Sequence, residues 1–163
     1  PLDASHIIYT MHAYAPHPYT HQEIPNPLHT YPGFFDVDYD GKPDRFDHAW
    51  LEESFAEARN FQQQLNLTLA VNEFGLVRWA PNAPHYISDE IALFEQYGWN
   101  YALWQWYPAW LPQAEGDHGF NFRFGSNPLQ RSEQTNPLWD TYQQAWARNT
   151  LRPSNWVKTA PNN

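Results

Sequence analysis

Glu73 stands at the end of a strongly apolar run, in the stretch LAVNEFGLVRWAP of residues 69–81. The letters LTLAV before it are apolar on both faces, as expected of a parallel strand covered by helices. Reactive groups of α/β folds lie at the carboxyl ends of such strands. A carboxylate in this position can attack an anomeric carbon or stabilise the positive charge that develops there. The plainer interpretation is a structural carboxylate paired with Arg78 or His12.

Two further runs end in side chains that suit sugar chemistry. His12 and Tyr14 are two residues apart, so they point to the same side of an extended strand. The hydroxyl of Tyr14 can donate to a carboxylate and favour its ionised form. Trp104 lies at the end of the third run, where a flat indole ring offers a platform for a pyranose ring. Trp79 and Trp106 fit either a sugar contact or the protein core.

These residues are positioned by three repeats of a strand, a loop and a helix. Apolar and β-branched runs predict strands over residues 6–14, 67–74 and 99–106. Apolar residues at helical spacing predict helices over 47–66, 83–97 and 137–149. Asp47 and Asn136 have the residue type of an N-cap, and Gly98 ends the second helix. Trp99, at the start of a strand, is expected in the core.

This alternation predicts a parallel sheet. Three parallel strands leave two open edges, and a complete eight-stranded barrel needs about 250 residues. We therefore expect an α/β fold that is a partial (β/α)8 TIM barrel. Residues 1–150 would form its last three βα units, strands six to eight, and 151–163 an extended tail. The alternatives are a half barrel that pairs with another chain and a small doubly wound domain, although no Gly-rich phosphate loop follows any strand.

The composition excludes several partners and chemistries. A formal net charge of −9 argues against a nucleic-acid backbone or an anionic membrane surface as partner, because both need clustered Lys and Arg. There is no run of about 18 apolar residues, so we expect no membrane span. The chain has no cysteine, which excludes disulfides, thiol catalysis and cysteine-bound zinc.

Three pieces of the chain together resemble one enzyme family. They are HAY followed by THQ near the first strand, NEFGLVRWAP at the second and YALWQW at the third. In this order they are similar to the C-terminal half of glycoside hydrolase family five, the cellulase and mannanase family of clan A, over most of residues 6–149. The resemblance implies that Glu73 is the nucleophile of a retaining mechanism and that His12 and Tyr14 orient it. It also implies that Trp104 forms the floor of the subsite, with Trp79 and Trp106 as further wall residues.

The sequence departs from the family at one decisive point. The family's acid/base glutamate lies in an Asn-Glu-Pro motif, and this motif is absent here. We therefore expect a fragment of a β-glycan endo-hydrolase that is inactive alone and has the N-terminal half of the same barrel as its partner. The substrate would be a β-linked polysaccharide or oligosaccharide, with β-1,4-glucan the first choice and mannan the second. The alternatives are a non-catalytic carbohydrate-binding remnant and a self-associating half barrel.

The family also implies an extracellular or periplasmic location and no required cofactor. The first residues, PLDASHIIYT, show no signal-peptide pattern, so the chain itself gives no independent indication of location.

A second candidate site lies in the acidic stretch DVDYDGKPDRFD, residues 36–47. Asp36, Asp38 and Asp40 follow the first half of a calcium loop, and Asp44 and Asp47 fall at its ninth and twelfth positions. These five carboxylates could hold a structural calcium ion. The plainer interpretation is a solvated acidic loop in which Asp47 caps a helix. Three histidines at 12, 17 and 21 could also bind a metal, but their spacing in a proline-broken loop fixes no geometry.

Overall fold

The structure, a computed structural model, describes residues 7–26, 28–106 and 118–149. Its central element is a parallel three-stranded sheet in the order β1-β4-β5, with β1 Ile8–Ala13, β4 Thr68–Phe74 and β5 Asn100–Leu103. A small antiparallel hairpin pairs β2 Gly33–Phe35 with β3 Asp44–Phe46. The helices are α1 His17–Thr20, α2 His48–Ser54, α3 Ala56–Leu65, α4 Ala83–Tyr97 and α6 Pro137–Ala147, with 3-10 turns η1 His118–Phe120 and η2 Phe122–Phe124.

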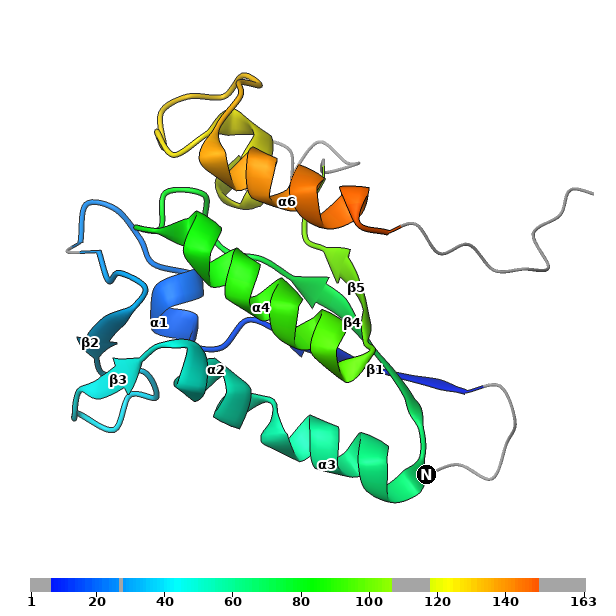
Figure 1. Ribbon diagram of the computed structural model, residues 1–163. Helices are drawn as coiled ribbons and strands as arrows, with labels where there is room; N and C mark the ends of the chain where they lie inside the picture. The colour runs from blue at the N-terminus through cyan, green and yellow to red at the C-terminus, as the bar shows by residue number, and fades with distance from the viewer. Residues whose placement is uncertain (1–6, 27, 107–117, 150–163) are drawn as a thin grey trace, which may run out of the picture.

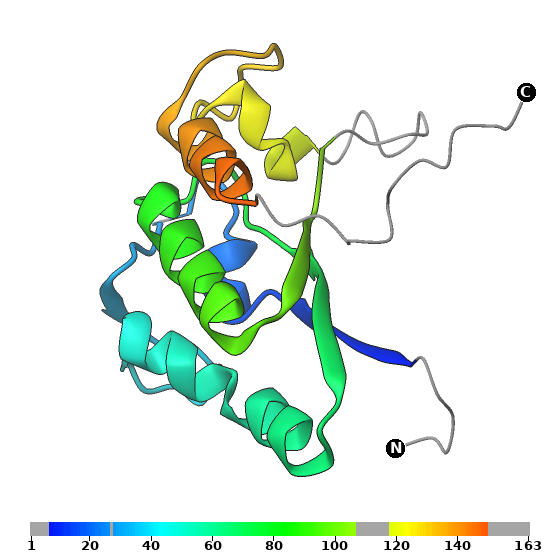
Figure 2. The same cartoon turned by 45° about the vertical axis from the view of Figure 1, so that its right-hand side comes forward.

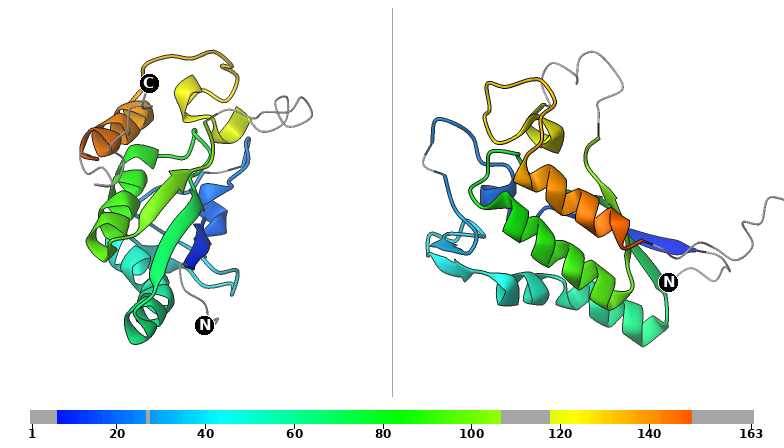
Figure 3. Two further views of the ribbon diagram at one scale, coloured as in Figure 1. Left: turned by 90° about the vertical axis from the view of Figure 1, so that its right-hand side faces the viewer. Right: turned by 45° about the horizontal axis from the view of Figure 1, so that its top comes forward.

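The helices cover one face of the sheet. Figures 1 and 2 show α4 lying along the sheet, with α2 and α3 on one side of it and α6 on the other, and Figure 3 shows the same three rows of helices from two further directions. Leu69, Val71 and Phe74 of β4 are buried beneath them. Alternate strand residues point the other way and are exposed, among them Thr10, Thr68, Asn72, Asn100 and Ala102. Within residues 7–26, 28–106 and 118–149, one face of the sheet is therefore uncovered.

An irregularity in the register between β1 and β4 places His12 opposite Glu73. Ile8 to Met11 pair in order with Thr68 to Val71, and the register then shifts so that His12 lies opposite Glu73. Asn72 is passed over at this point. The shift brings the imidazole of His12 beside the last polar residue of β4, which a regular ladder would not do.

The predicted strands and helices are confirmed in type and order. The helix expected over 83–97 has those bounds, and Gly98 ends it in the left-handed conformation with φ +70°. Asn136 and Asp47 cap the helices that follow them, as predicted. Trp99 is buried in the core, also as predicted. The third strand is shorter than expected and ends at Leu103, and the tail predicted at 151–163 lies outside the described residues.

The helix expected over 47–66 is instead two helices. They meet at Phe55, which is the C-cap residue of α2 and the N-cap residue of α3. The hydroxyl of Ser54 donates to the Leu51 carbonyl at 2.7 Å, competing with the helical backbone bond to the same oxygen. The ring of Phe55 is buried against Phe94 and Trp99, which fixes the direction of the break. Within the described part of the chain, no helix is long and apolar enough to cross a bilayer.

Candidate active site

The carboxylate of Glu73 lies between two side chains from the neighbouring strand and the turn after it. The Tyr14 hydroxyl donates to Glu73 Oε2 at 3.2 Å, and His12 Nδ1 lies 3.3 Å from the same oxygen. The side chain of Glu73 is 30% exposed and that of His12 is 54% exposed, so both can be reached from solvent. Because both contacts are to Oε2, they fix the carboxylate and leave Oε1 outside the pair. The structure thus brings together the three residues expected to do the chemistry.

Tyr14 is itself held by residues of the following turn. The hydroxyl of Thr20 donates to the Tyr14 carbonyl at 2.6 Å. The Tyr14 ring meets the rings of His21 and Phe120 edge to face, with centroids 5.4 and 6.0 Å away. Sequence reasoning assigned no role to Phe120, because nothing in its local pattern points to a residue more than 100 positions away. The stretch THQ, residues 20–22, was the only part of the sequence that pointed to this turn.

The imidazole beside Tyr14 is uncharged at neutral pH. Burial, and then the neighbouring His17, lower the pKa of His21 to about 4. The two imidazole rings stack with centroids 4.1 Å apart. His17 Nδ1 in turn lies 3.1 Å from the hydroxyl of Tyr39. The two stacked rings therefore form a flat wall next to Tyr14, and stacked rings are a poor arrangement for shared metal ligation.

Trp104 is placed next to the end of β4 by close backbone packing. Its amide donates to the Phe74 carbonyl at 2.8 Å. Gly75 has φ +148°, and any Cβ at this position would collide with the Trp104 carbonyl. Only glycine allows this approach of the two strand ends. The backbone of Trp104 is therefore held beside the end of β4.

The other two predicted tryptophans have contacts of their own. Trp79 donates from its indole nitrogen to the Gln22 carbonyl at 3.0 Å, and its ring packs so closely on Gly119 that no Cβ would fit there. Trp106 is 53% exposed, and its contacts in the described chain include the rings of Phe122 and Trp146 on the α6 side. The described contacts of Trp79 include Gln22 and Gly119, and no contact described for Trp106 leads to Glu73.

Arg78 is not the partner of Glu73. It is 2% exposed, and its guanidinium donates to main-chain carbonyls of one long loop: those of His118, Gly125, Asn127, Pro128 and Gln130. Burial, and then the charge of Arg131, lower the pKa of Arg78 to about 10, so it stays charged at neutral pH. The alternative in which Arg78 neutralises Glu73 is therefore wrong. Arg78 instead holds the loop that carries Phe120 against the turn after Glu73.

The five predicted calcium ligands do not form one cluster. Oxygens of Asp36, Asp38 and Asp40 lie within 4.8 Å of one another. Asp44 is not part of this cluster and pairs with Phe35 in the hairpin. Asp47 is also outside the cluster, since it accepts the amides of Ala49 and Trp50 as the cap of α2. The structure therefore gathers only the first three of the five predicted ligands, and the plainer role of Asp47 as a helix cap is confirmed.

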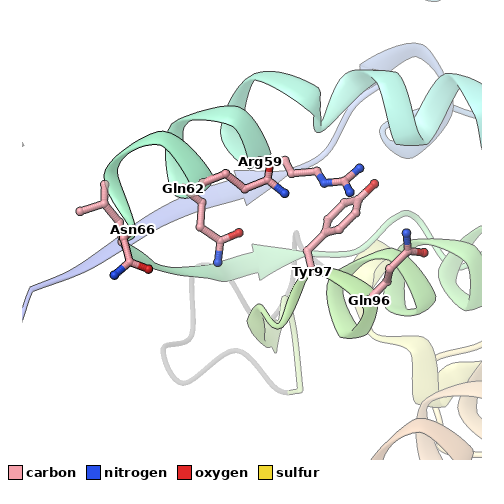
Figure 4. Close-up of a pocket in the computed structure, with 7 residues that line it drawn as sticks. Arg59, Gln62, Asn66, Gln96 and Tyr97 are labelled. Atoms are coloured by element: carbon pink, nitrogen blue, oxygen red, sulfur yellow. The ribbon is translucent and has the colours of Figure 1, made fainter.

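A polar pocket of about 290 Å³ lies between α3 and α4 at the opposite end of β4 from Glu73 (Figure 4). It is lined by Arg59, Gln62, Gln63, Asn66, Leu67, Gln96 and Tyr97. Asn66 and Leu67 directly precede β4, whereas Glu73 comes near its end. The pocket is therefore remote from the carboxylate site, which lies at the carboxyl end of the central strand.

Comparisons with known proteins agree with this fold and define its class. The chain resembles two solved structures: a crystal structure of a glycoside hydrolase, with 24% identity and a TM-score of 0.51, and Cel5A of Thermotoga maritima in complex with mannotriose substrate, with 20% identity and a TM-score of 0.56. They match 61% and 86% of this chain, and the chain spans 30% and 41% of theirs. At this identity the likeness establishes a TIM-barrel-like α/β fold.

The model of the family described as "Cellulase (glycosyl hydrolase family 5)" matches residues 1–109. The chain therefore belongs to this family, and the predicted resemblance is confirmed for the family, while the assignment to the C-terminal half stays a prediction. No curated protein matched the sequence. The doubly wound alternative is set aside, because both the family and the similar structures have the barrel type of fold.

Proposed function

We propose that this chain is the C-terminal part of the catalytic barrel of a retaining β-glycan endo-hydrolase, with Glu73 as its nucleophile. The observation that carries the proposal is the contact of Glu73 Oε2 with both Tyr14 and His12, at the carboxyl end of the central strand. Reactive groups lie at this end of the strands in barrel enzymes.

In the proposed reaction Glu73 attacks the anomeric carbon and forms a covalent glycosyl-enzyme. The leaving oxygen takes a proton from a second carboxylic acid, and water then hydrolyses the intermediate with the second group acting as base. Retaining chemistry needs the two carboxyl groups about 5–5.5 Å apart. Among the described residues, no contact joins Glu73 to another carboxylate. We assign the acid/base group to the part of the barrel outside this chain, where the family's Asn-Glu-Pro motif lies. Tyr14 and His12 orient the nucleophile, and Trp104 supports the sugar ring.

The uncovered half of the sheet supports an incomplete barrel. The face that carries Thr10, Asn72 and Asn100 is exposed, and β1 and β5 form the two free edges of the sheet. A closed barrel has neither exposed inner faces nor free edges. We assign the three strands as six to eight and propose that the N-terminal half of the same barrel covers them. The isolated chain then has no turnover.

The substrate we propose is a β-linked glucan, with mannan as the second choice. The mannotriose named for Cel5A of Thermotoga maritima supports a β-linked oligosaccharide of this kind. The mechanism needs no cofactor, because two carboxyl groups are sufficient. Any calcium held by Asp36, Asp38 and Asp40 would be structural. An extracellular or periplasmic location follows from the polymeric substrate.

Reconstitution tests the proposal. The chain is co-expressed with the upstream half of its barrel, and hydrolysis of a soluble β-glucan is followed together with the anomeric configuration of the first product. We expect activity only from the mixture, retention of configuration, and a loss on the order of 10³-fold or more in Glu73→Gln. The exposed Glu57→Gln is the matched control and should act like the unmodified chain. Inversion of configuration, or full activity in Glu73→Gln, would refute the assignment.

A self-associating half barrel is the second candidate, and the exposure of Ile8 on the free edge favours it. A second copy could pair with that edge and cover the open face. Light scattering distinguishes a dimer of the chain from a monomer. A non-catalytic carbohydrate-binding remnant would instead show sugar affinity that survives Glu73→Gln, with no hydrolysis in the assembled barrel.

A further inference from the structure

Glu90 is a carboxyl group buried in the core without a cation. It lies on the sheet-facing side of α4 and is 0% exposed. Its Oε1 is 2.8 Å from the hydroxyl of Tyr86, one turn earlier on the same helix. No described residue forms a hydrogen bond with Oε2. No described Lys or Arg pairs with Glu90 either. Among the residues that the structure describes, this fully buried carboxyl group thus has a single hydrogen-bond partner, the hydroxyl of Tyr86.

A second contact of the Tyr86 hydroxyl decides which group donates in the hydrogen bond between Tyr86 and Glu90. It lies 3.0 Å from the Ala15 carbonyl, which can only accept. A phenol has one proton to donate. If Tyr86 donates to Ala15, the contact with Glu90 requires a proton on Glu90 Oε1. If Tyr86 donates to Glu90 instead, a buried carboxylate is left with one hydrogen bond and no counter-charge, which is far more costly than a buried neutral acid.

The groups around Glu90 agree with a neutral carboxyl. Four tyrosines interact with it electrostatically: Tyr19 of α1, Tyr31 before β2, Tyr86 of α4 and Tyr142 of α6. The pKa of each phenol is raised, mainly by burial and further by Glu90. Burial raises the pKa of Glu90 well above its ordinary value, against the smaller opposing effect of the Tyr86 hydrogen bond. None of these neighbours supplies a positive charge.

The series of hydrogen bonds from Glu90 through Tyr86 to Ala15 ends next to the candidate active site. Ala15 directly follows Tyr14, whose hydroxyl contacts Glu73. The Tyr14 carbonyl is held by Thr20 and the Ala15 carbonyl by Tyr86, so two consecutive peptide groups after β1 are fixed by hydroxyls. Figures 1 and 2 show the amino-terminal half of α4 beside α1, which follows this turn.

We propose that Glu90 is a neutral carboxylic acid and a positioning residue. It donates its proton to the Tyr86 hydroxyl, Tyr86 donates to the Ala15 carbonyl, and the turn so fixed holds Tyr14 against Glu73. The first two steps stand on geometry alone. The last step, an effect on catalysis, rests on the proposed hydrolase function.

Infrared spectroscopy tests the protonation directly. Difference spectra at pH 7 compare the folded chain with Glu90→Gln and, as a control, with the exposed Glu57→Gln. A carboxylic-acid carbonyl band lost in Glu90→Gln and kept in Glu57→Gln is the expected result. If Glu90→Gln removes only carboxylate bands, Glu90 is ionised and the proposal is overturned. The Gln amide can still donate to Tyr86, so this variant is expected to fold.

The pH dependence of unfolding gives a second, independent readout. The folded pKa of Glu90 lies above the ordinary value of 4.5, so the unfolded state releases this proton first and stability falls as pH rises above about 4.5. The unfolding equilibrium constant of the unmodified chain should therefore rise about tenfold per pH unit relative to Glu90→Gln. It should level off only when pH passes the folded pKa. Parallel pH profiles would overturn the proposal.

Activity in the assembled barrel tests the positioning role. Glu90→Leu, which cannot donate, should lower kcat about tenfold with KM little changed, and Glu90→Gln should restore it. Tyr86→Phe should act like Glu90→Leu. If kcat of all three variants equals that of the unmodified barrel, Glu90 is not a positioning residue. The infrared band would still decide whether Glu90 is protonated. If no assembled barrel hydrolyses any β-glucan, the hydrolase function fails, and the infrared and stability results on Glu90 stand unaffected.

Discussion

Removing the guanidinium of Arg78 should release the loop over residues 118–130 from the rest of the site. Five hydrogen bonds join this side chain to loop carbonyls, at 2.5 to 3.1 Å. At about 1 kcal/mol net for each bond, Arg78→Met would cost about 5 kcal/mol. Some of the freed carbonyls can bind water, so we expect roughly 3–5 kcal/mol, in line with other buried charged groups that lose their partners.

Urea unfolding followed by tryptophan fluorescence measures this loss, and limited proteolysis locates it. Arg78→Met should lower the free energy of unfolding by the stated amount and expose the loop to cleavage. Arg78→Lys should recover only part of it, because an ammonium has three donors and cannot span five carbonyls. The exposed Arg131→Met is the matched control, with an expected change within about 0.5 kcal/mol. A loss below about 1 kcal/mol in Arg78→Met, with unchanged proteolysis, would refute the view that this residue holds the loop.

Three further predictions concern the site and its supports. Tyr14→Phe removes one of the two contacts to Glu73 and should lower kcat of the assembled barrel by about tenfold to a hundredfold, measured by steady-state kinetics. Gly75→Ala should destabilise the chain by about 1–3 kcal/mol in urea unfolding, because its φ is positive and a Cβ meets a carbonyl. Calcium at about a hundred times its dissociation constant should stabilise the chain by about 2.7 kcal/mol, and Asp38→Asn should weaken this gain.

Each of these has a matched control. Tyr39→Phe, on an exposed ring that contacts His17, should change kcat less than Tyr14→Phe does. Gly41→Ala also has a positive φ but meets nothing within 4 Å, so it should cost less than Gly75→Ala. EGTA should reverse the calcium effect, and no shift of the melting temperature at millimolar calcium would remove the proposed ion.

The sequence predicted those features that local periodicity encodes. Apolar runs and helical spacing located all three parallel strands and the bounds of α4, and the rule that strand ends carry chemistry selected Glu73, His12 and Tyr14 together. The period of two in a strand does not reveal the register shift that places His12 opposite Glu73, since a bulge depends on both strands at once.

The remaining features depend on contacts between distant segments. Apolar residues at helical spacing predicted the helix over 83–97 but gave no role to its Glu90, which is fully buried and bonded to Tyr86. The carbonyl set around Arg78 comes from a loop 40 to 52 residues later. The surroundings of Arg78 leave no sequence pattern, because its partners are backbone carbonyls that every residue has.

Trapping of the covalent intermediate tests the nucleophile most directly. The assembled barrel is incubated with a fluorinated β-glycoside that forms the glycosyl-enzyme rapidly and hydrolyses slowly, and peptides are then analysed by mass spectrometry. Glu73 is predicted to be the residue that carries the sugar, with no label in Glu73→Gln and normal label in Glu57→Gln. Sugar attached to any other residue, or an active barrel that never becomes labelled, would contradict the account.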